Sequence, residues 1–174
     1  MFGSYNQKRL LGLVNDRDQE RVRGELTLFF GPRADVYLNV YDKMRVNSAE
    51  GRLFAMTWSW PTFFGAFVWF FYRRMYGVGA LMILVPIVLG LLFPTATGGS
   101  MAAVAIFAKP AYVFSALGRI LKADALALTG TERSDYLQRA GGVSLVSGVL
   151  AGLLYVALLA VAVAAIFVGD RQTP

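Results

Sequence analysis

The chain begins with a polar segment and continues with long apolar blocks. The first 52 residues are polar and densely charged, whereas four apolar blocks follow, at residues 53–71, 75–93, 101–121 and 143–169. A hydrocarbon core of about 30 Å needs roughly 20 apolar residues in a helix that rises about 1.5 Å per residue. Each block is about that long. The pattern therefore predicts an all-α integral membrane protein.

An amphipathic helix is predicted at residues 33–45. Apolar residues recur there at the spacing of one helix face, and charged or amide side chains occupy the other face. The apolar face consists of Val36, Tyr37, Val40, Tyr41 and Met44, and the polar face of Arg33, Asp35, Asn39, Asp42 and Lys43. A helix of this kind either lies on the bilayer surface or caps the membrane domain, and the pattern leaves both open.

The stretches before this helix have other patterns. Residues 15–25 alternate acidic and basic side chains, which is typical of a solvated surface or tail. Residues 25–30 form a short strand-like run that ends at Gly31 and Pro32. Residues 1–7 lack the basic and apolar regions of a signal peptide, so an internal apolar segment is expected to direct insertion.

The positions of the basic residues favour three crossings over four. Nine Lys and Arg residues precede residue 53, Arg73 and Arg74 follow, and four more lie between residues 119 and 139. If all four blocks crossed with the N-terminus inside, the last six would face outward, against the positive-inside rule. If the first block stays on the cytoplasmic face, all of them face the cytoplasm. We therefore predict a cytoplasmic region at residues 1–52, spans at 75–93, 101–121 and 143–169, and a short tail at 170–174.

The first apolar block has the features of an interfacial or re-entrant helix. Nine aromatic residues lie between residues 58 and 72. Tryptophan and tyrosine prefer the headgroup boundary, where the ring is half buried and the polar atom stays hydrated. Pro61 and Gly65 are expected to interrupt or bend the block. Residues 53–72 are therefore predicted to lie at cytoplasmic headgroup depth.

Two arginines flanked by tyrosines end this block. Such arginines at a membrane surface either bind lipid phosphates or act as plain topological anchors. The positions expected to contact anionic lipid or a partner protein are Trp58, Trp60, Trp69, Tyr72, Arg73, Arg74 and Tyr76.

Lys109 is the most unusual residue of the predicted spans. It lies near the middle of residues 101–121 and precedes Pro110, which kinks a helix. A charge at mid-membrane costs at least about 2.5–3.5 kcal/mol on insertion scales. Lys109 is either an intramembrane site or, if the span starts late, a side chain that reaches the boundary.

Small residues recur every four positions at the start of the last block. Ser144, Gly148 and Gly152 form a small-xxx-small series that lets two helix backbones approach closely. The partner helix belongs either to the same chain or to a second copy.

The composition narrows the possible chemistry. Hydrophobic residues make up 56% of the chain, and it contains no Cys and no His. Disulfides, thiolate and imidazole catalysis and the commonest metal ligands are thereby excluded. Asp124, Glu132 and Asp135 have the pattern of an ordinary solvated face, and no nucleotide-binding or hydrolase motif is present. We expect no enzyme activity, no cofactor, no metal and no nucleic-acid partner.

Residues 30–76 resemble a known family. They read Phe-Gly-Pro-Arg-Ala-Asp-Val-Tyr-Leu from Phe30, then Trp-Ser-Trp-Pro-Thr-Phe-Phe-Gly-Ala-Phe-Val-Trp-Phe-Phe-Tyr-Arg-Arg-Met-Tyr from Trp58 to Tyr76. This resembles the small bacterial inner-membrane proteins grouped as domain of unknown function 2628. Arg74 stands where that family usually has Lys, which keeps the charge. The resemblance implies a bacterial plasma membrane and a cytoplasmic N-terminal region, and it implies no activity.

The function expected from these features is that of a non-catalytic membrane protein. It would serve as an accessory or scaffold subunit of a larger inner-membrane complex, with lipid and other membrane subunits as partners. The alternative is a small transporter or channel component that uses Lys109 within the membrane.

Overall fold

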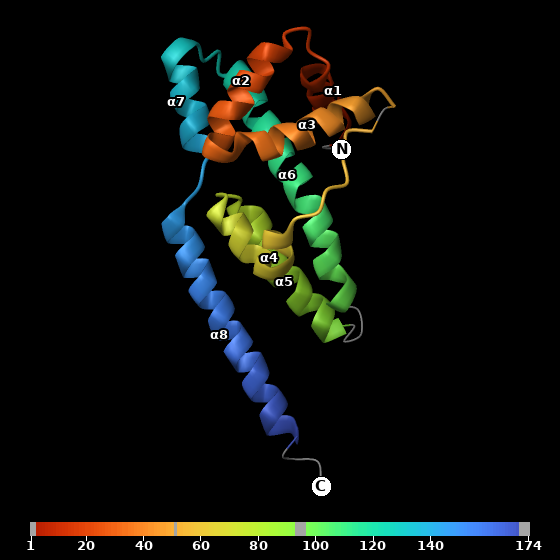
Figure 1. Cartoon of the computed structure of the whole chain (residues 1–174), viewed down its shortest axis with the longest axis vertical. Helices are drawn as coiled ribbons and strands as arrows, with labels where there is room; N and C mark the ends of the chain where they lie inside the picture. Colours follow the sequence, from red (N-terminus) through yellow and green to blue (C-terminus); the bar gives the residue numbers. More distant parts are fainter. Residues whose placement is uncertain (1–2, 51, 93–96, 171–174) are drawn as a thin grey trace.

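The computed structural model describes residues 3–50, 52–92 and 97–170, and every regular element in these ranges is helical (Figure 1). The predicted all-α fold class is therefore confirmed. The elements are α1 (Gly3–Val14), α2 (Gln19–Phe30), the 3-10 helix η1 (Gly31–Arg33), α3 (Ala34–Ser48), α4 (Trp60–Tyr72), α5 (Tyr76–Leu92), α6 (Thr97–Ala125), α7 (Gly130–Ala140) and α8 (Leu145–Asp170).

The helices form two parts, stacked along the long axis of the molecule (Figure 1). The upper part contains α1, α2, α3, α7 and the C-terminal half of α6. The lower part contains α4, α5, α8 and the beginning of α6. The upper part thus combines helices of residues 1–52 with the C-terminal half of α6 and with α7.

Helix α6 belongs to both parts. Its C-terminal half contacts α1, α2, α3 and α7, and Tyr112, Leu117 and Ile120 are completely buried there. Two helical stretches of the described chain, Ala102–Ala125 and Gly130–Ala164, are long and apolar enough to cross a membrane. In the most apolar part of the first, 44% of the residues are buried inside the protein, against 6% in the second. Much of the apolar surface of α6 is therefore covered by the chain itself.

Helix α2 replaces the strand expected at residues 25–30. The helix begins inside the charged stretch that precedes this run, where the Asp18 side chain accepts a hydrogen bond from the Arg21 backbone N–H. Val22, Leu26 and Phe29 are buried at helical spacing. The strand prediction was wrong because the short run 25–30 also fits the last turns of a longer amphipathic helix.

Helix α3 confirms the predicted amphipathic helix. Tyr37, Val40, Tyr41 and Met44 of its apolar face are buried, whereas Val36 is exposed. The helix packs against α2 and α6. Its apolar face is therefore covered by the protein, which excludes that face as a bilayer contact.

The segment 53–72 is only partly helical. Residues 53–59 run without regular structure, and α4 begins at Trp60. Pro61 lies in the first turn, where a missing N–H costs nothing, and the side chains of Ser59 and Thr62 share a buried hydrogen bond of 2.8 Å. The helix then continues unbroken through Gly65 to Tyr72. Pro61 starts the helix and does not interrupt it, contrary to expectation.

The turn from α4 to α5 is a Schellman motif. The Met75 N–H donates to the Phe70 carbonyl at 2.8 Å, and the Arg74 N–H donates to the Phe71 carbonyl at 3.1 Å. Arg74 has a φ of 58°, a left-handed conformation in which glycine is usual. The motif reverses the chain in few residues and leaves Arg73 on the side of the upper helices.

The connection from α7 to α8 joins the two parts. The Gly142 N–H donates to the Phe29 carbonyl, and the Ser144 N–H donates to the Tyr72 carbonyl, each at 2.8 Å. A Cβ atom at Gly141 would lie 2.1 Å from the Phe29 oxygen. Glycine is therefore required at residue 141 by this close backbone approach.

Candidate functional site

Arg73 lies at the junction of the two parts and is buried, with 7% of its surface exposed. Its guanidinium lies over the rings of Tyr37, Tyr112 and Tyr72, at 4.8, 5.2 and 5.7 Å from the ring centres. These rings come from α3, α6 and α4. Arg73 therefore ties three helices together through cation–π contacts.

The charge of Arg73 has no acidic partner. No carboxylate of the described residues forms an ion pair with Arg73, and its Nε is buried without a hydrogen-bond partner. Burial raises the pKa of the Tyr37 hydroxyl, and the nearby positive charge of Arg73 opposes that rise. The tyrosine faces are thus the main stabilising surroundings of this cation.

A cluster of rings surrounds the junction. Tyr112 contacts Phe29, Phe30, Tyr37 and Trp69 with centroid distances between 4.9 and 5.9 Å. Trp69 is only 9% exposed. Trp69 and Arg73, both predicted to contact lipid or a partner, are instead buried among residues of their own chain.

Arg74 and Tyr76, at the turn from α4 to α5, contact α7 and α8. The Arg74 guanidinium donates to the Arg139 carbonyl at 2.7 Å, and the hydroxyls of Tyr76 and Ser147 are 3.2 Å apart. Arg74 and Tyr76 remain exposed, and Tyr72 is half-buried. This turn therefore positions α8 as well as α5.

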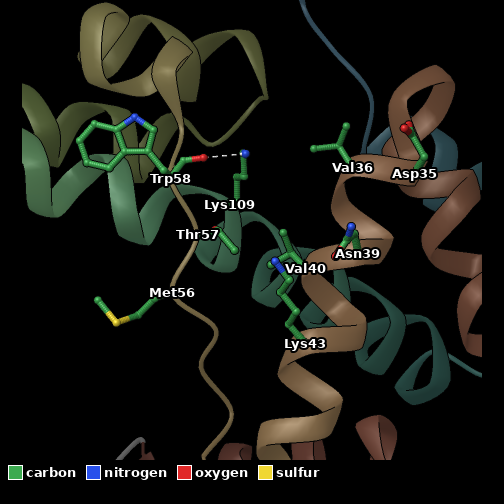
Figure 2. Close-up of a pocket in the computed structure, with 9 residues that line it drawn as sticks. All are labelled: Asp35, Val36, Asn39, Val40, Lys43, Met56, Thr57, Trp58 and Lys109. Atoms are coloured by element: carbon green, nitrogen blue, oxygen red, sulfur yellow. Dashed lines mark hydrogen bonds between the residues drawn. The ribbon is translucent and has the colours of Figure 1, made fainter.

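Lys109 lies where α6 passes into the upper part. Its ammonium group donates a hydrogen bond of 2.7 Å to the backbone carbonyl of Trp58 (Figure 2). The side chain is half-buried and lines a cavity between α3, the segment before α4, and α6. Lys43 of α3 lines the same cavity. The sequence pattern did not indicate that Lys43 and Lys109 line one cavity, since 66 positions separate them.

The tryptophans at the start of α4, Trp58 just before it and Trp60 as its first residue, form an exposed aromatic group. The rings of Trp58 and Trp60 are 5.3 Å apart, and Trp60 stacks on Phe64 at 5.9 Å. Trp60 and Phe64 are more than 60% exposed, and Trp58 is 37% exposed. Unlike Trp69, these residues remain available for lipid or a partner.

The small residues of α8 differ in their surroundings. At Gly148 an added Cβ would lie 3.1 Å from the Tyr72 ring, so this position packs closely on α4. At Gly152 no atom lies within 4 Å of such a Cβ. Ser144 uses its side chain locally, donating to the Ser147 hydroxyl at 2.9 Å. Within the chain, Gly148 therefore fits the predicted packing role, whereas Gly152 faces open space.

An ion-pair network at the top of the molecule was not anticipated. Arg133 of α7 forms two hydrogen bonds to the Glu25 carboxylate, at 2.7 and 2.8 Å, and a 2.8 Å ion pair to Asp124. The side chains of Glu25 and Arg133 are only 11% and 14% exposed. Asp124 thus belongs to a partly buried network and not to an ordinary solvated face.

No group of three or more Asp or Glu side chains in these ranges lies in a position to hold a metal ion. The described residues do contain exposed apolar surfaces and a cavity lined by two lysines.

Comparison with protein families, with curated proteins and with solved structures finds no match to this chain. The resemblance of residues 30–76 to the domain of unknown function 2628 therefore stays a prediction.

Proposed function

We propose that this chain is a non-catalytic protein of the bacterial inner membrane, an accessory or scaffold subunit of a larger membrane complex with its N-terminal part in the cytoplasm. The surface of α8 carries this proposal. Val146, Leu150, Leu153 and Val161 are each more than 60% exposed, and α8 packs mainly against α4. Large exposed apolar surfaces mark contact with lipid or with other proteins.

The lengths of α8 and α5 support two of the three proposed spans. Helix α8 has 26 residues, or about 39 Å, which exceeds a hydrocarbon core of about 30 Å. Helix α5 has 17 residues, or about 26 Å, and turns back into α6 as a hairpin. Helix α4 has only 13 residues, about 20 Å, which favours a place at the interface.

The charges at the junction support the orientation. Arg73, Arg74 and Arg139 gather where α4, α7 and α8 meet, on the side of the polar helices. Under the positive-inside rule this side faces the cytoplasm. The resemblance of residues 30–76 to bacterial inner-membrane proteins agrees with that orientation.

A role in a complex accounts for the uncovered faces of α8 better than transport does. A transporter or channel using Lys109 needs a polar path along the spans. Between Val78 and Val85, helix α5 has only apolar side chains and glycine. Lys109 itself bonds to a backbone carbonyl at the junction.

Purification of the tagged, full-length protein from bacterial membranes in a mild detergent tests the proposal. We expect it to resist extraction by carbonate and to co-elute with at least one other membrane protein in fixed stoichiometry. Gly152→Leu adds bulk to an open position of α8 and should weaken that association. Val156→Leu, one turn further on, is the matched control. Elution as a single chain without a stoichiometric partner would overturn the accessory role.

A further inference from the structure

A cavity of about 490 Å³ opens between α3, the segment before α4, and α6 (Figure 2). Its size lies within the range of about 300–1,000 Å³ that is common for small-molecule sites. Lys109 comes from α6, Lys43 and Asn39 from α3, and Thr57 and Trp58 from the connecting segment. Five polar or amphipathic side chains from three segments thus converge on one space.

Two positive charges in this cavity lack counterions. Neither Lys109 nor Lys43 forms an ion pair with a carboxylate of the described residues, and their charges repel each other. The only hydrogen bond that Lys109 makes within the described chain is to the Trp58 carbonyl. Such a bond uses one of the three ammonium protons, so donors remain for a ligand.

The single acidic residue at the cavity lies at its far end. Asp35 is two helical turns before Lys43 on α3, about 12 Å along the helix axis. Figure 2 shows Asp35 apart from both lysines, with Val36 between Asp35 and Lys109 in this view. The part of the cavity between Lys43 and Lys109 therefore has a net positive charge.

Two uncharged polar side chains, Thr57 and Asn39, line the cavity beside the lysines. The Thr57 hydroxyl is buried and has no hydrogen-bond partner. The Asn39 amide faces the same cavity. A buried hydroxyl without a partner costs free energy that a bound acceptor would recover. Hydroxyl, amide and ammonium donors together suit a ligand with several acceptor oxygens.

The cavity also lies beside the exposed aromatic group. Met56, at the edge of the cavity, is 73% exposed, and the Trp58 ring packs edge to face against the Trp60 ring. Tryptophans of this kind mark the depth of lipid headgroups. If the chain is a membrane protein as proposed above, the cavity opens at the level of lipid phosphates.

We propose that this cavity binds a phosphate group through Lys43 and Lys109, with the Thr57 hydroxyl and the Asn39 amide as further donors. The phosphate belongs either to the headgroup of an anionic lipid or to a small soluble phosphate ester. Lysine binds phosphate as a point charge, so two lysines facing one cavity can neutralise it without a fixed planar geometry.

Binding to the delipidated, full-length protein in mild detergent tests this proposal. Phosphatidylglycerol and phosphatidylcholine are titrated by native mass spectrometry, and glycerol 3-phosphate by calorimetry. The double variant K43Q/K109Q should bind the anionic ligand about tenfold more weakly, because charge-assisted hydrogen bonds are lost while Gln can still donate to the Trp58 carbonyl. K43R/K109R should retain binding. R119Q/K122Q, which also removes two positive charges but elsewhere on α6, is the matched control.

The arms of the experiment separate the two sources. Retention of phosphatidylglycerol alone assigns the site to a lipid headgroup, and binding of glycerol 3-phosphate assigns it to a soluble ester. Unchanged binding by K43Q/K109Q, or an equal loss in R119Q/K122Q, would overturn the phosphate site.

A second measurement uses the unaltered protein and does not depend on how the variants fold. Bound ligand should protect Lys43, but not Lys122, from an amine-reactive reagent. Equal labelling of both lysines would also overturn the site. The soluble arm needs no bilayer, so its failure is distinct from a failure of the membrane proposal.

Discussion

At the scale of single residues, the buried cation at the junction of the upper and lower parts requires arginine, and not lysine, at residue 73. Arg73 has three tyrosine faces within 5.7 Å and no carboxylate partner among the described residues. A planar guanidinium stacks on aromatic faces, whereas an ammonium group is a compact, strongly hydrated charge. Burial of an ammonium group in the same place would therefore cost more free energy than burial of the guanidinium group.

Arg73→Lys is expected to lower the free energy of unfolding by about 1–2 kcal/mol, since the charge remains while the stacked contacts are lost. Chemical unfolding of the protein in mild detergent, followed by circular dichroism, measures this difference. Arg74→Lys is the control and should cost less than about 0.5 kcal/mol, because Arg74 is exposed and Lys can still donate to the Arg139 carbonyl. Equal losses of unfolding free energy in the two variants would show that the tyrosine contacts of Arg73 do not stabilise the folded protein.

At the scale of elements, α7 is held by its contacts with α2 and the end of α6. The helix itself is polar, with Leu137 as its one fully buried residue. Its apolar contact is thus small. The ion pairs of Arg133 with Glu25 and Asp124 supply the remaining specific contacts.

Glu25→Ala should loosen the docking of α7. Removing one partner of a buried ion pair costs about 3–5 kcal/mol, and we expect about 2–3 kcal/mol because Asp124 still pairs with Arg133. Hydrogen exchange should show faster exchange of the α7 amides. In the control, Asp42→Ala breaks the exposed pair between Asp42 and Arg23 and should cost less than about 1 kcal/mol. Unchanged protection of α7 in Glu25→Ala would contradict this account.

At the scale of the whole molecule, α6 is the helix that links the upper part to the lower part. Its C-terminal half is enclosed by other helices, and its first half pairs with α5 in a hairpin. The orientation of the upper part relative to the lower part is therefore set by α6 and by the hydrogen bonds of the α7–α8 connection.

Single cysteines test the proposed topology, because the chain has no cysteine of its own. With an impermeant thiol reagent, Ala49→Cys and Thr131→Cys should label only after the cells are permeabilised, since both exposed positions belong to the part proposed to lie in the cytoplasm. Thr97→Cys, at the start of α6, should label in intact cells. Labelling of Thr131→Cys in intact cells would place the polar part outside and overturn the orientation.

The sequence by itself determined the helical class, the amphipathic α3 and the apolar α8. Each depends on properties of neighbouring residues: the period at which apolar side chains recur, or the length of an apolar run. The same local reasoning failed at residues 25–30. A six-residue window there could not show that the helix is capped by Asp18, seven positions earlier.

Only the tertiary structure decided which charges meet. Arg133 and Glu25 are 108 positions apart, and Lys109 bonds to a carbonyl 51 positions away. Arg73 has the sequence context of a surface anchor, yet Tyr37 and Tyr112 enclose it from two other helices. Contacts between distant segments leave no periodic trace in either segment, because each depends on how whole helices pack. The candidate sites of this protein are built from such contacts.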